Sequence, residues 1–324
     1  MSKELTIALD RYDRHLPLFF GAARLPDGQQ YRALEVGMVP PRRDGVARHR
    51  RMLIDLEFDA AEVSLCSYIM AKKRGVPLTG IPAFPRRLFS QNHIYVNVNS
   101  GIRAPQDLVG KRVGLWAFQV TMSVLAKGDL KSEHGVPWEK IHWVTEAPEE
   151  IEWSSQELSI ERAPKGRSIA QMVVDGELDG YIYPHPEAAV QSRTDRVRRL
   201  FPDSKTESVR YFNKRGYYPI MHLLAVKDER VRERASLPLE LMQLWEEAKR
   251  QSYDLYHDPG YALLAFSRNE YEAQTSTFGV DPWPSGLAAN RKNLEDFMDY
   301  MVDQQLLDAP LPMDSLFDRS VLGT

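Results

Sequence analysis

The sequence predicts an α/β protein with two lobes, each a mainly parallel β-sheet flanked by helices, joined by a two-strand hinge. Short strand-like segments alternate with helical ones over most of the chain, which is typical of parallel sheets. The 324 residues are enough for two hydrophobic cores. The chain is expected to leave the first lobe near residues 92–97 and to return near 212–221. A simpler interpretation is one large α/β domain.

The first lobe begins with a five-residue strand, Leu5 to Leu9, which ends at Asp10. Apolar periodicity and turn residues then predict a helix, a short buried strand, a second helix and two strands. These elements occupy residues 48–55, 58–63, 67–74, 78–84 and 94–98 in turn. Gly75 and Pro77 mark the end of the second helix.

The second lobe repeats this alternation, starting with a turn and one helical turn. Its elements are expected at residues 101–108, 111–115, 121–130, 141–144, 168–175 and 178–183. A strand at 219–226 returns the chain, and the helical period dominates residues 237–266 and 286–307. Lobe I therefore comprises residues 1–94 and 218–324 and lobe II residues 95–217, with a ligand cleft between them. The acidic segment 146–165 is expected to be an exposed insertion, to which we assign no function.

Composition limits the classes of partner. The net charge of −3 and the isoelectric point near 6.3 give no sign of a nucleic-acid-binding surface. The basic runs at Arg42-Arg43 and Arg48-His49-Arg50-Arg51 lie near acidic residues, so we expect them on solvated faces. No apolar run approaches the ~18 residues that span a membrane. The sequence leaves the oligomeric state open, a homo-oligomer included.

The one cysteine, Cys66, excludes an intrachain disulfide. It lies among apolar residues, which favours a buried, inert thiol over a nucleophile. The N-terminal segment leads directly into the first strand and lacks the longer apolar region of a secretory signal. We therefore expect a cytoplasmic protein.

Polar and aromatic side chains follow four predicted strands, where α/β sheets bind ligands. The residues that we select are Tyr12, Arg14, Ser64, Ser67, Trp116, Gln119, Thr121 and His185. Guanidinium groups pair with carboxylates and stack on aromatic faces, so this set favours a flat, anionic ligand. Taken singly, residues such as Arg14 or His185 are more typical of a protein surface, or of groups that support a site, than of ligand contacts. Their joint placement is what indicates a site.

Arg86 and Arg87 precede the predicted hinge, and in an extended segment they point to opposite sides, so at most one faces the cleft. His93 and His222 lie on the two hinge segments and are candidate proton donors, because the pKa of histidine lies near neutrality. A core histidine is the competing interpretation. No HExxH, CxxC or GxSxG motif is present, which argues against a metal or a nucleophilic mechanism.

An unusual aromatic turn, Asp281-Pro282-Trp283-Pro284, interrupts the helical C-terminal third and is followed by Asn290-Arg291. Two prolines restrict the backbone on either side of the tryptophan. Such a turn can also serve only to pack against and close a lobe. The turn alone therefore does not distinguish a structural role from a functional one.

Several phrases together resemble the 4,5-dihydroxyphthalate decarboxylase family, which has the fold of type II periplasmic solute-binding proteins. They are Tyr12-Asp13-Arg14, Glu57 to Glu62 with Ser64, Ser67 and Tyr68, Ile81 to Pro85 with Arg87 and Phe89, Ile94 to Asn97, Asp107 to Gly114, Gln119 with Thr121, Gly176 to Asp179, Tyr218 to His222, and the Asp281 to Pro284 turn with Asn290-Arg291. The resemblance covers nearly the whole chain. His93, the Trp116-Ala117-Phe118 loop and the acidic segment depart from the family pattern.

The resemblance implies decarboxylation of a hydroxylated aromatic acid without a cofactor. In our hypothesis His222 donates the proton and His185 is the partner of the phenol. Arg14 and Arg87 would hold a carboxylate, and Trp116 would stack on the ring. The remaining substrate-binding candidates are polar side chains: Tyr12, Ser64, Ser67, Gln119, Thr121 and Tyr218. The alternative is a solute-binding or sensor protein that binds a small anionic aromatic or dicarboxylic ligand without catalysis.

Overall fold

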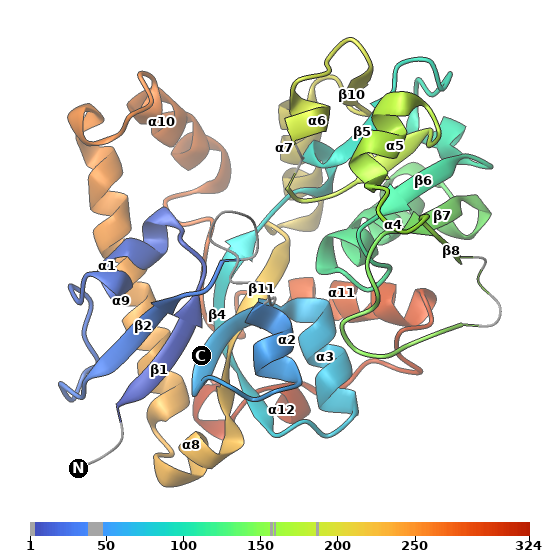
Figure 1. Cartoon of the computed structure of the whole chain (residues 1–324). Coiled ribbons are helices and arrows are strands. Elements are labelled where there is room, and N and C mark those ends of the chain that lie inside the picture. Colours follow the sequence, from blue (N-terminus) through green and yellow to red (C-terminus); the bar gives the residue numbers. More distant parts are fainter. Residues whose placement is uncertain (1–3, 38–47, 156–157, 159, 186–187) are drawn as a thin grey trace. The chain divides into compact units, whose positions relative to one another are not determined.

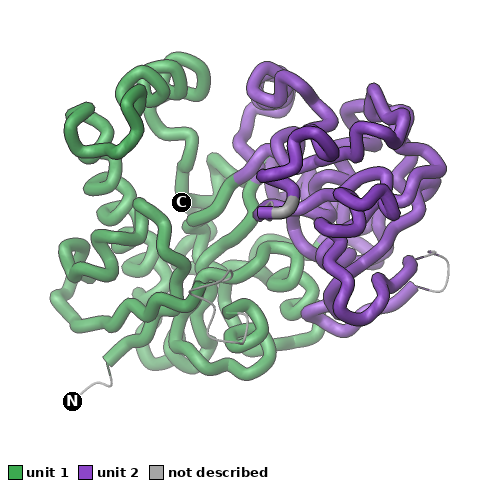
Figure 2. The backbone as a smooth tube through the Cα atoms, turned by 45° about the horizontal axis from the view of Figure 1, so that its top comes forward, with its two compact units in different colours: residues 1–87, 220–292, 311–324 green, residues 88–219, 293–310 purple. Residues whose placement is uncertain are grey.

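The computed structural model describes residues 4–37, 48–155, 158, 160–185 and 188–324 (Figure 1). The chain forms two compact units (Figure 2). Unit 1 contains residues Met1–Arg87, Ile220–Lys292 and Leu311–Thr324, and unit 2 contains Leu88–Pro219 and Asn293–Pro310.

The units differ from the predicted lobes at the hinge, where residues 88–94 and 218–219 fall in unit 2, and in one longer segment. Residues 293–310, which we expected in lobe I, belong to unit 2. The buried face of helix α11 (Arg291–Asp303) carries Leu294, Phe297, Met298 and Met301. This face packs in unit 2, where the Gln304 side chain also donates a hydrogen bond to the carbonyl of Val124 at 2.9 Å. Periodicity identifies such an apolar face but not the partner against which it packs.

Unit 1 is built on a five-stranded sheet with the order β2-β1-β3-β11-β4. Its strands are β1 (Leu5–Leu9), β2 (Tyr31–Glu35), β3 (Ala60–Ser64), β4 (Leu78–Arg87) and β11 (Ile220–Lys227). β1 pairs in parallel with β2 and β3, whereas β11 runs antiparallel to both of its neighbours. The strand that returns from unit 2 is therefore the one that breaks the parallel pattern.

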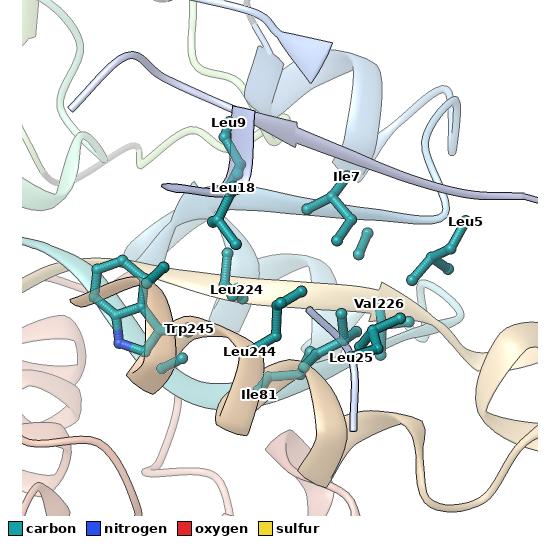
Figure 3. Close-up of a cluster of buried hydrophobic side chains, with 14 of the residues drawn as sticks. Leu5, Ile7, Leu9, Leu18, Leu25, Ile81, Leu224, Val226, Leu244 and Trp245 are labelled. Carbon is teal, nitrogen blue, oxygen red and sulfur yellow. The ribbon is translucent and has the colours of Figure 1, made fainter. Parts of the chain in front are cut away.

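The helices of unit 1 are α1 (Leu16–Phe19), α2 (Arg48–Leu53), α3 (Leu65–Lys73), α8 (Asp228–Glu233), α9 (Leu237–His257), α10 (Ser267–Phe278) and α12 (Met313–Leu316), with the 3-10 turns Asp13–His15, Pro259–Tyr261 and Arg319–Val321. Leu241, Leu244 and Trp245 of α9 pack with β-strand residues in the main core (Figure 3). The predicted helical run 237–266 ends earlier, at His257, because Asp258-Pro259-Gly260 forms a turn.

Unit 2 contains a six-stranded sheet with the order β10-β5-β9-β6-β7-β8. The strands are β5 (Ile94–Asn97), β6 (Arg112–Leu115), β7 (His142–Thr145), β8 (Ile160–Arg162), β9 (Gly180–Ile182) and β10 (Val197–Arg199). β9, β6, β7 and β8 pair in parallel, and β5 is antiparallel to β9 and β10. Besides α11, the helices are α4 (Thr121–His134), α5 (Ile169–Asp175), α6 (Ala188–Gln191) and α7 (Ser204–Arg215), with 3-10 turns at Ser90–Asn92, Pro105–Leu108 and Trp138–Lys140.

Gly128 allows α4 and α11 to approach closely. A Cβ atom at this position would lie 2.2 Å from the ring of Tyr300 on α11. Only glycine therefore leaves room for this ring against the α4 backbone. The hydroxyl of Tyr300 then reaches the buried carboxylate of Asp129 at 3.3 Å.

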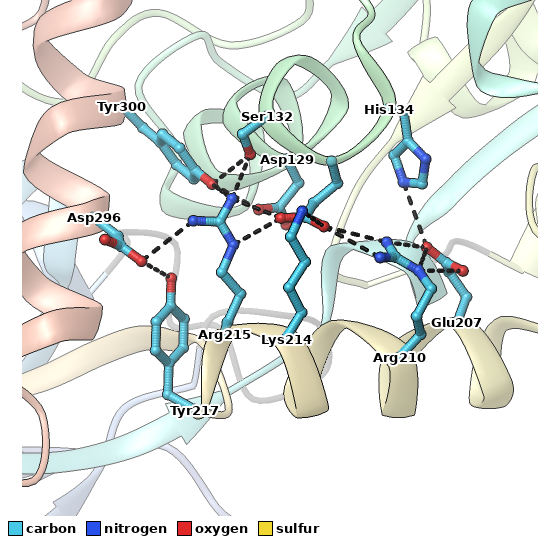
Figure 4. A network of polar contacts seen from close by, with 11 residues as sticks. Asp129, Ser132, His134, Glu207, Arg210, Lys214, Arg215, Tyr217, Asp296 and Tyr300 are labelled. Carbon is cyan, nitrogen blue, oxygen red and sulfur yellow. Dashed lines mark hydrogen bonds and ion pairs between the residues drawn. The ribbon is translucent and has the colours of Figure 1, made fainter.

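Asp129 belongs to a polar network of unit 2 that joins α4, α7 and α11 (Figure 4). Ser90 donates a hydrogen bond to its Oδ2 atom at 2.6 Å. Arg215 binds the Glu133 carboxylate through Nε at 2.7 Å and lies 3.4 Å from Asp296, which also accepts a hydrogen bond from Tyr217. Burial raises the pKa of Asp129 to about 7, although the hydrogen bond from Ser90 opposes this shift.

In the part of the chain that the structure describes, no helix combines the length and the apolar character needed to cross a membrane.

We predict that Asp129→Asn stabilises the protein above pH 7. The pKa of Asp129 in the folded state lies above its ordinary value of 3.8, so its favourable contribution is complete below pH 3.8 and is lost as the pH rises through 7. The stability difference between variant and wild type should change by up to about 1.4 kcal/mol per pH unit in this window. Thermal unfolding of both proteins at pH 5 and pH 8 measures this difference in stability.

The matched control is Asp296→Asn, which changes a half-buried carboxylate of the same network that binds Arg215 and Tyr217. It should destabilise at both pH values. Equal melting temperatures of wild type and Asp129→Asn at pH 8 would contradict the assignment.

Candidate functional site

A buried carboxylate, Glu62 of β3, organises the polar cluster of unit 1 and is fully shielded from solvent. Its Oε1 atom accepts hydrogen bonds from Nδ1 of His222 at 2.5 Å and from the hydroxyl of Tyr12 at 3.0 Å. Its Oε2 atom lies 3.2 Å from Nη2 of Arg48 and accepts a bond from the backbone N–H of Asp10 at 3.3 Å. Four segments that are distant in sequence thus meet at one side chain.

Strand register explains why Glu62 and His222 meet. β3 and β11 are antiparallel neighbours in which Glu62 pairs with Leu224 and Ser64 pairs with His222. Side chains two residues apart lie on the same face of a strand, so Glu62 and His222 share one face of the sheet on adjacent strands. Asp10 and Tyr12 follow β1, the other neighbour of β3, and reach the same place.

Arg48 supplies the positive charge that Glu62 requires. Its side chain is completely buried at the start of α2, and it donates hydrogen bonds to the backbone carbonyls of Glu62 at 2.9 Å and Val36 at 2.5 Å. Burial opposes ionisation of Glu62, but the charge of Arg48 and the bond from His222 outweigh it, so the pKa of Glu62 lies well below its usual range. Glu62 is therefore ionised at neutral pH.

His222 is a neutral imidazole in this environment. Burial lowers its pKa to about 4, against the opposing influence of Glu62. Because the Glu62 carboxylate only accepts hydrogen bonds, the hydrogen of His222 must lie on Nδ1, which leaves the lone pair on Nε2. His49 contacts His222 edge to face, with ring centroids 4.8 Å apart, and burial holds the pKa of His49 well below its ordinary value.

Arg86 and Arg87 point to different surroundings, as the extended segment predicts. Arg87 is buried, and its Nη2 atom binds the carbonyl of Pro284 at 2.9 Å and Oδ1 of Asn290 at 2.5 Å. Arg87, our predicted carboxylate ligand, is thus used to hold the C-terminal aromatic turn. Arg86 pairs with His222 across the β4–β11 ladder, and its charge lowers the pKa of His222, after the larger influences of burial and Glu62.

Arg14 lies between two aromatic rings. Its guanidinium carbon is 4.1 Å from the ring centroid of Tyr12 and 4.4 Å from that of Trp283. Nε donates to the carbonyl of Pro85 at 2.6 Å. Lys249 fixes the turn that carries Trp283, because its Nζ atom binds Oδ2 of Asp281 at 2.6 Å and the carbonyl of Trp283 at 2.9 Å. The aromatic turn therefore positions an arginine beside the Glu62 cluster through Tyr12.

Ser64 and Ser67 lie where β3 passes into α3. Ser64 is the residue before the helix, its side chain makes no capping bond, and it pairs with His222 in the sheet. Ser67 is buried in the first turn. Ser64 is thus a neighbour of the Glu62 cluster.

The candidate residues of unit 2 contact several different partners. Trp116 packs against Tyr183 and Tyr183 against His185, with centroid distances of 5.9 and 5.8 Å. Tyr218 stacks on Phe89 at 4.5 Å, and the carbonyl of His93 accepts a bond from the backbone of Tyr183 at 3.2 Å.

Gln119 and Thr121 are buried at the start of α4. The Gln119 side chain binds both backbone groups of Ile151, at 2.5 and 3.1 Å, and Glu149 accepts hydrogen bonds from the backbone N–H groups of Phe118 and Gln119. These bonds attach Gln119, which we predicted to bind substrate, to the acidic segment. Residues 156, 157 and 159 of that segment lie outside the described chain.

Sequence reasoning missed the residues at the centre of the cluster: Glu62, Arg48, His49 and Arg86. We expected the run Arg48 to Arg51 on a solvated face, but Arg48 and His49 are buried; Arg42 and Arg43 lie outside the described residues. A usable signal was present, because Glu62 stands between the apolar residues Ala61 and Val63 of a strand expected to be buried, and a fully buried carboxylate requires a partner. Among the described residues, no three His, Cys, Asp or Glu side chains gather in a way that could hold a metal ion.

The chain has relatives in sequence. It is 31% identical over 309 residues to 4,5-dihydroxyphthalate decarboxylase of Comamonas testosteroni, which covers 92% of this chain and 91% of that protein. It is 27% identical over 221 residues to the protein of the same name from Pseudomonas putida, covering 66% of this chain and 83% of the relative. Residues 34–147 match the family described as NMT1/THI5 like.

Solved structures of solute-binding proteins share the fold. The periplasmic sulfonate-binding protein SsuA from Methylobacillus flagellatus KT aligns with a TM-score of 0.58 at 11% identity, covering 98% of this chain and 91% of that one. The aliphatic sulphonate-binding protein SsuA from Escherichia coli gives 0.54 at 11% identity, with 98% and 92% coverage. The fold is thus that of two-lobed type II periplasmic solute-binding proteins.

We predict that Arg48→Met destabilises unit 1 by ~3–5 kcal/mol, because it leaves the buried charge of Glu62 without its cation. The control is Arg51→Met on the same helix. Arg51 pairs with Glu57 at 2.6 Å, but Glu57 is 45% exposed, so this change should cost about 0–1 kcal/mol. Urea unfolding of both variants measures the difference, and similar costs would contradict the central role of Arg48.

Proposed function

Because this chain belongs to the 4,5-dihydroxyphthalate decarboxylase family, we propose that it decarboxylates a hydroxylated aromatic acid of the phthalate type. The observation that carries the proposal is the buried hydrogen bond of 2.5 Å between His222 and Glu62. This bond orients a histidine that can carry a proton, and Arg14 and Arg86 lie nearby. A proton donor combined with arginines suits an anionic aromatic substrate.

The reaction exchanges a carboxylate for a proton on a ring carbon. When a hydroxyl para to the carboxylate loses its proton, negative charge is delocalised onto the ring carbon that carries the carboxylate. That carbon takes up a proton and becomes tetrahedral. The bond to the carboxylate then breaks, CO₂ leaves, and the electron pair of the broken bond restores the aromatic ring. The protein must therefore provide a proton donor at the ring carbon and a partner for the phenol.

His222 is our proton donor. The free protein holds it neutral, and a bound carboxylate would add negative charge and raise its pKa, as Glu62 does. Uptake of a proton from solvent on Nε2 then gives an imidazolium, which remains paired with Glu62 through Nδ1 and presents the Nε2–H to the substrate. Glu62 acts as a positioning residue, because its bond to Nδ1 selects the tautomer and aligns the ring.

Arg14 is our carboxylate ligand, and Arg86 takes the place that we first gave to Arg87. Nε of Arg14 is bound to Pro85 and Nη1 to Asp13, so Nη2 is the atom that we assign to the substrate. The stacking of Arg14 between Tyr12 and Trp283 reduces the entropy lost on binding. His185 remains our candidate for the phenol partner.

The second candidate function is binding without catalysis. The fold shared with SsuA favours it, since SsuA proteins are solute-binding proteins. Both functions need the same arginines, but only decarboxylation needs the proton carrier.

We predict that the wild-type protein releases CO₂ from 4,5-dihydroxyphthalate or a related hydroxylated aromatic acid. His222→Gln should lower kcat by about 10²–10⁴-fold, the usual contribution of general acid catalysis, while retaining substrate binding. Calorimetry measures substrate binding, and chromatography of the product measures kcat. Binding without CO₂ release by the wild type supports the second candidate, and full activity of His222→Gln removes His222 from the mechanism.

The Glu62→Gln variant tests the positioning role separately. Glu62 raises the pKa of His222 against burial, so its neutralisation lowers that pKa further. The alkaline limb of the kcat profile should therefore move to lower pH, and kcat should fall by more than tenfold. The exposed Glu57→Gln serves as control. A uniform loss of activity with an unshifted profile would indicate a merely structural role.

A further inference from the structure

One polar face of α9 holds the two segments whose aromatic rings enclose Arg14. Helix residues three and four positions apart share a face, and four polar side chains of α9 follow this spacing. Each donates a hydrogen bond either to the segment that follows Tyr12 or to the turn that carries Trp283. These side chains are Lys249, Ser252, Tyr253 and Tyr256.

Asp13 is the first acceptor on this face. Its Oδ2 atom accepts a hydrogen bond from the hydroxyl of Tyr256, and its backbone carbonyl accepts one from Ser252 at 3.1 Å. Its Oδ1 atom accepts bonds from the backbone N–H and from Nη1 of Arg14, at 2.8 and 3.1 Å. One carboxylate therefore connects the hydroxyl of Tyr256 to the guanidinium of Arg14.

Asp281 is the second acceptor, and it lies in the aromatic turn. Its Oδ2 atom binds Nζ of Lys249 at 2.6 Å, and its Oδ1 atom accepts a bond from the hydroxyl of Tyr253 at 3.3 Å. Lys249 also binds the carbonyl of Trp283 at 2.9 Å. The same helix face therefore fixes the backbone that carries the second ring beside Arg14.

The hydroxyl of Tyr256 supplies an orientation that burial does not. The side chain of Asp13 is 42% exposed, and a carboxylate in this situation keeps much of its rotational freedom unless hydrogen bonds fix it. Burial raises the pKa of Tyr256, so the hydroxyl keeps its proton at neutral pH and donates it to Asp13. This bond therefore holds Asp13 where its other oxygen binds Nη1 of Arg14.

Two acceptors then fix the guanidinium of Arg14 in its plane. Nε binds the carbonyl of Pro85 at 2.6 Å, and Nη1 binds Asp13 at 3.1 Å. If Asp13 turns away, the group can rotate about the Nε–Cζ bond and exchange its two Nη atoms. The contact between Asp13 and Tyr256 opposes that rotation.

We propose that Tyr256 is a positioning residue for an anionic substrate and acts through Asp13 on the guanidinium of Arg14. This inference rests on the proposed function, in which Arg14 holds a carboxylate of the substrate. A guanidinium that is oriented in advance loses less entropy when it binds a ligand. The bond from Tyr256 therefore strengthens substrate binding and leaves the proton transfer at His222 unchanged.

Kinetics of Tyr256→Phe on 4,5-dihydroxyphthalate test the proposal. The variant keeps the ring that stacks on Tyr271, with centroids 6.1 Å apart, and loses only the hydroxyl. KM should rise about tenfold while kcat stays within about a factor of two, because the lost hydrogen bond acts on binding and not on the chemical step. The control Tyr271→Phe removes a hydroxyl that lies 3.5 Å from Nε2 of His257 and should leave KM unchanged. A tenfold fall in kcat of Tyr256→Phe, or equal KM values of the two variants, would overturn the positioning role.

The Arg14→Ala variant separates this role from the proposed function. It should raise KM, and the addition of Tyr256→Phe should raise KM no further, because the hydroxyl acts through that arginine. An unchanged KM of Arg14→Ala overturns the carboxylate contact in the proposed function. A raised KM of Arg14→Ala together with an unchanged KM of Tyr256→Phe, or with a further rise in the double variant, overturns the role of Tyr256 alone.

The mobility of Arg14 gives a second measurement that needs no substrate. In protein labelled with ¹⁵N-arginine, the Nε–H resonance of Arg14 is identified by its loss in Arg14→Lys. Exchange of this hydrogen with water should be at least about tenfold faster in Tyr256→Phe than in the wild type or in Tyr271→Phe. Equal exchange rates in the three proteins would contradict the link from Tyr256 to Arg14, whatever the substrate.

Discussion

The ion pair between Glu62 and Arg48 is the interaction on which the candidate site depends. Each charge is removed completely from water, at a cost of several kcal/mol per ion, and only the presence of the other makes that tolerable. The pair joins β3 to α2, and Glu62 also binds the segment after β1 and, through His222, β11. The candidate site and the packing of unit 1 therefore depend on the same buried ion pair.

The same constraint underlies our proposal that His222 carries a proton. A buried histidine without a partner could adopt either tautomer. The ionised Glu62 selects one of them, and the desolvation that lowers the pKa of His222 also makes the imidazole respond strongly to a ligand's charge. A protein that only binds its ligand would gain little from such an arrangement, and this is why we favour catalysis over binding alone.

The sequence predicted local features well and long-range partners poorly. Strands such as Leu5–Leu9 appear as expected, and alternation along β4 predicted that Arg86 and Arg87 diverge, but not which one faces His222. That choice depends on the Asp281 to Pro284 turn, whose Pro284 carbonyl binds Arg87 almost 200 residues away. The bond between Gln119 and the backbone of Ile151 was equally beyond the sequence, because the two residues lie 32 positions apart. The basic run at Arg48 has the composition of a surface helix, and only its proximity to Glu62 explains its burial.

The protonation state of His222 tests the account most directly. In protein labelled with ¹⁵N-histidine, the His222 resonances are identified by their loss in His222→Gln. At pH 7 and without ligand, we expect a proton on Nδ1 and none on Nε2, with titration near pH 4. An imidazolium at pH 7, or a proton on Nε2 in place of Nδ1, would contradict the role that we assign to Glu62.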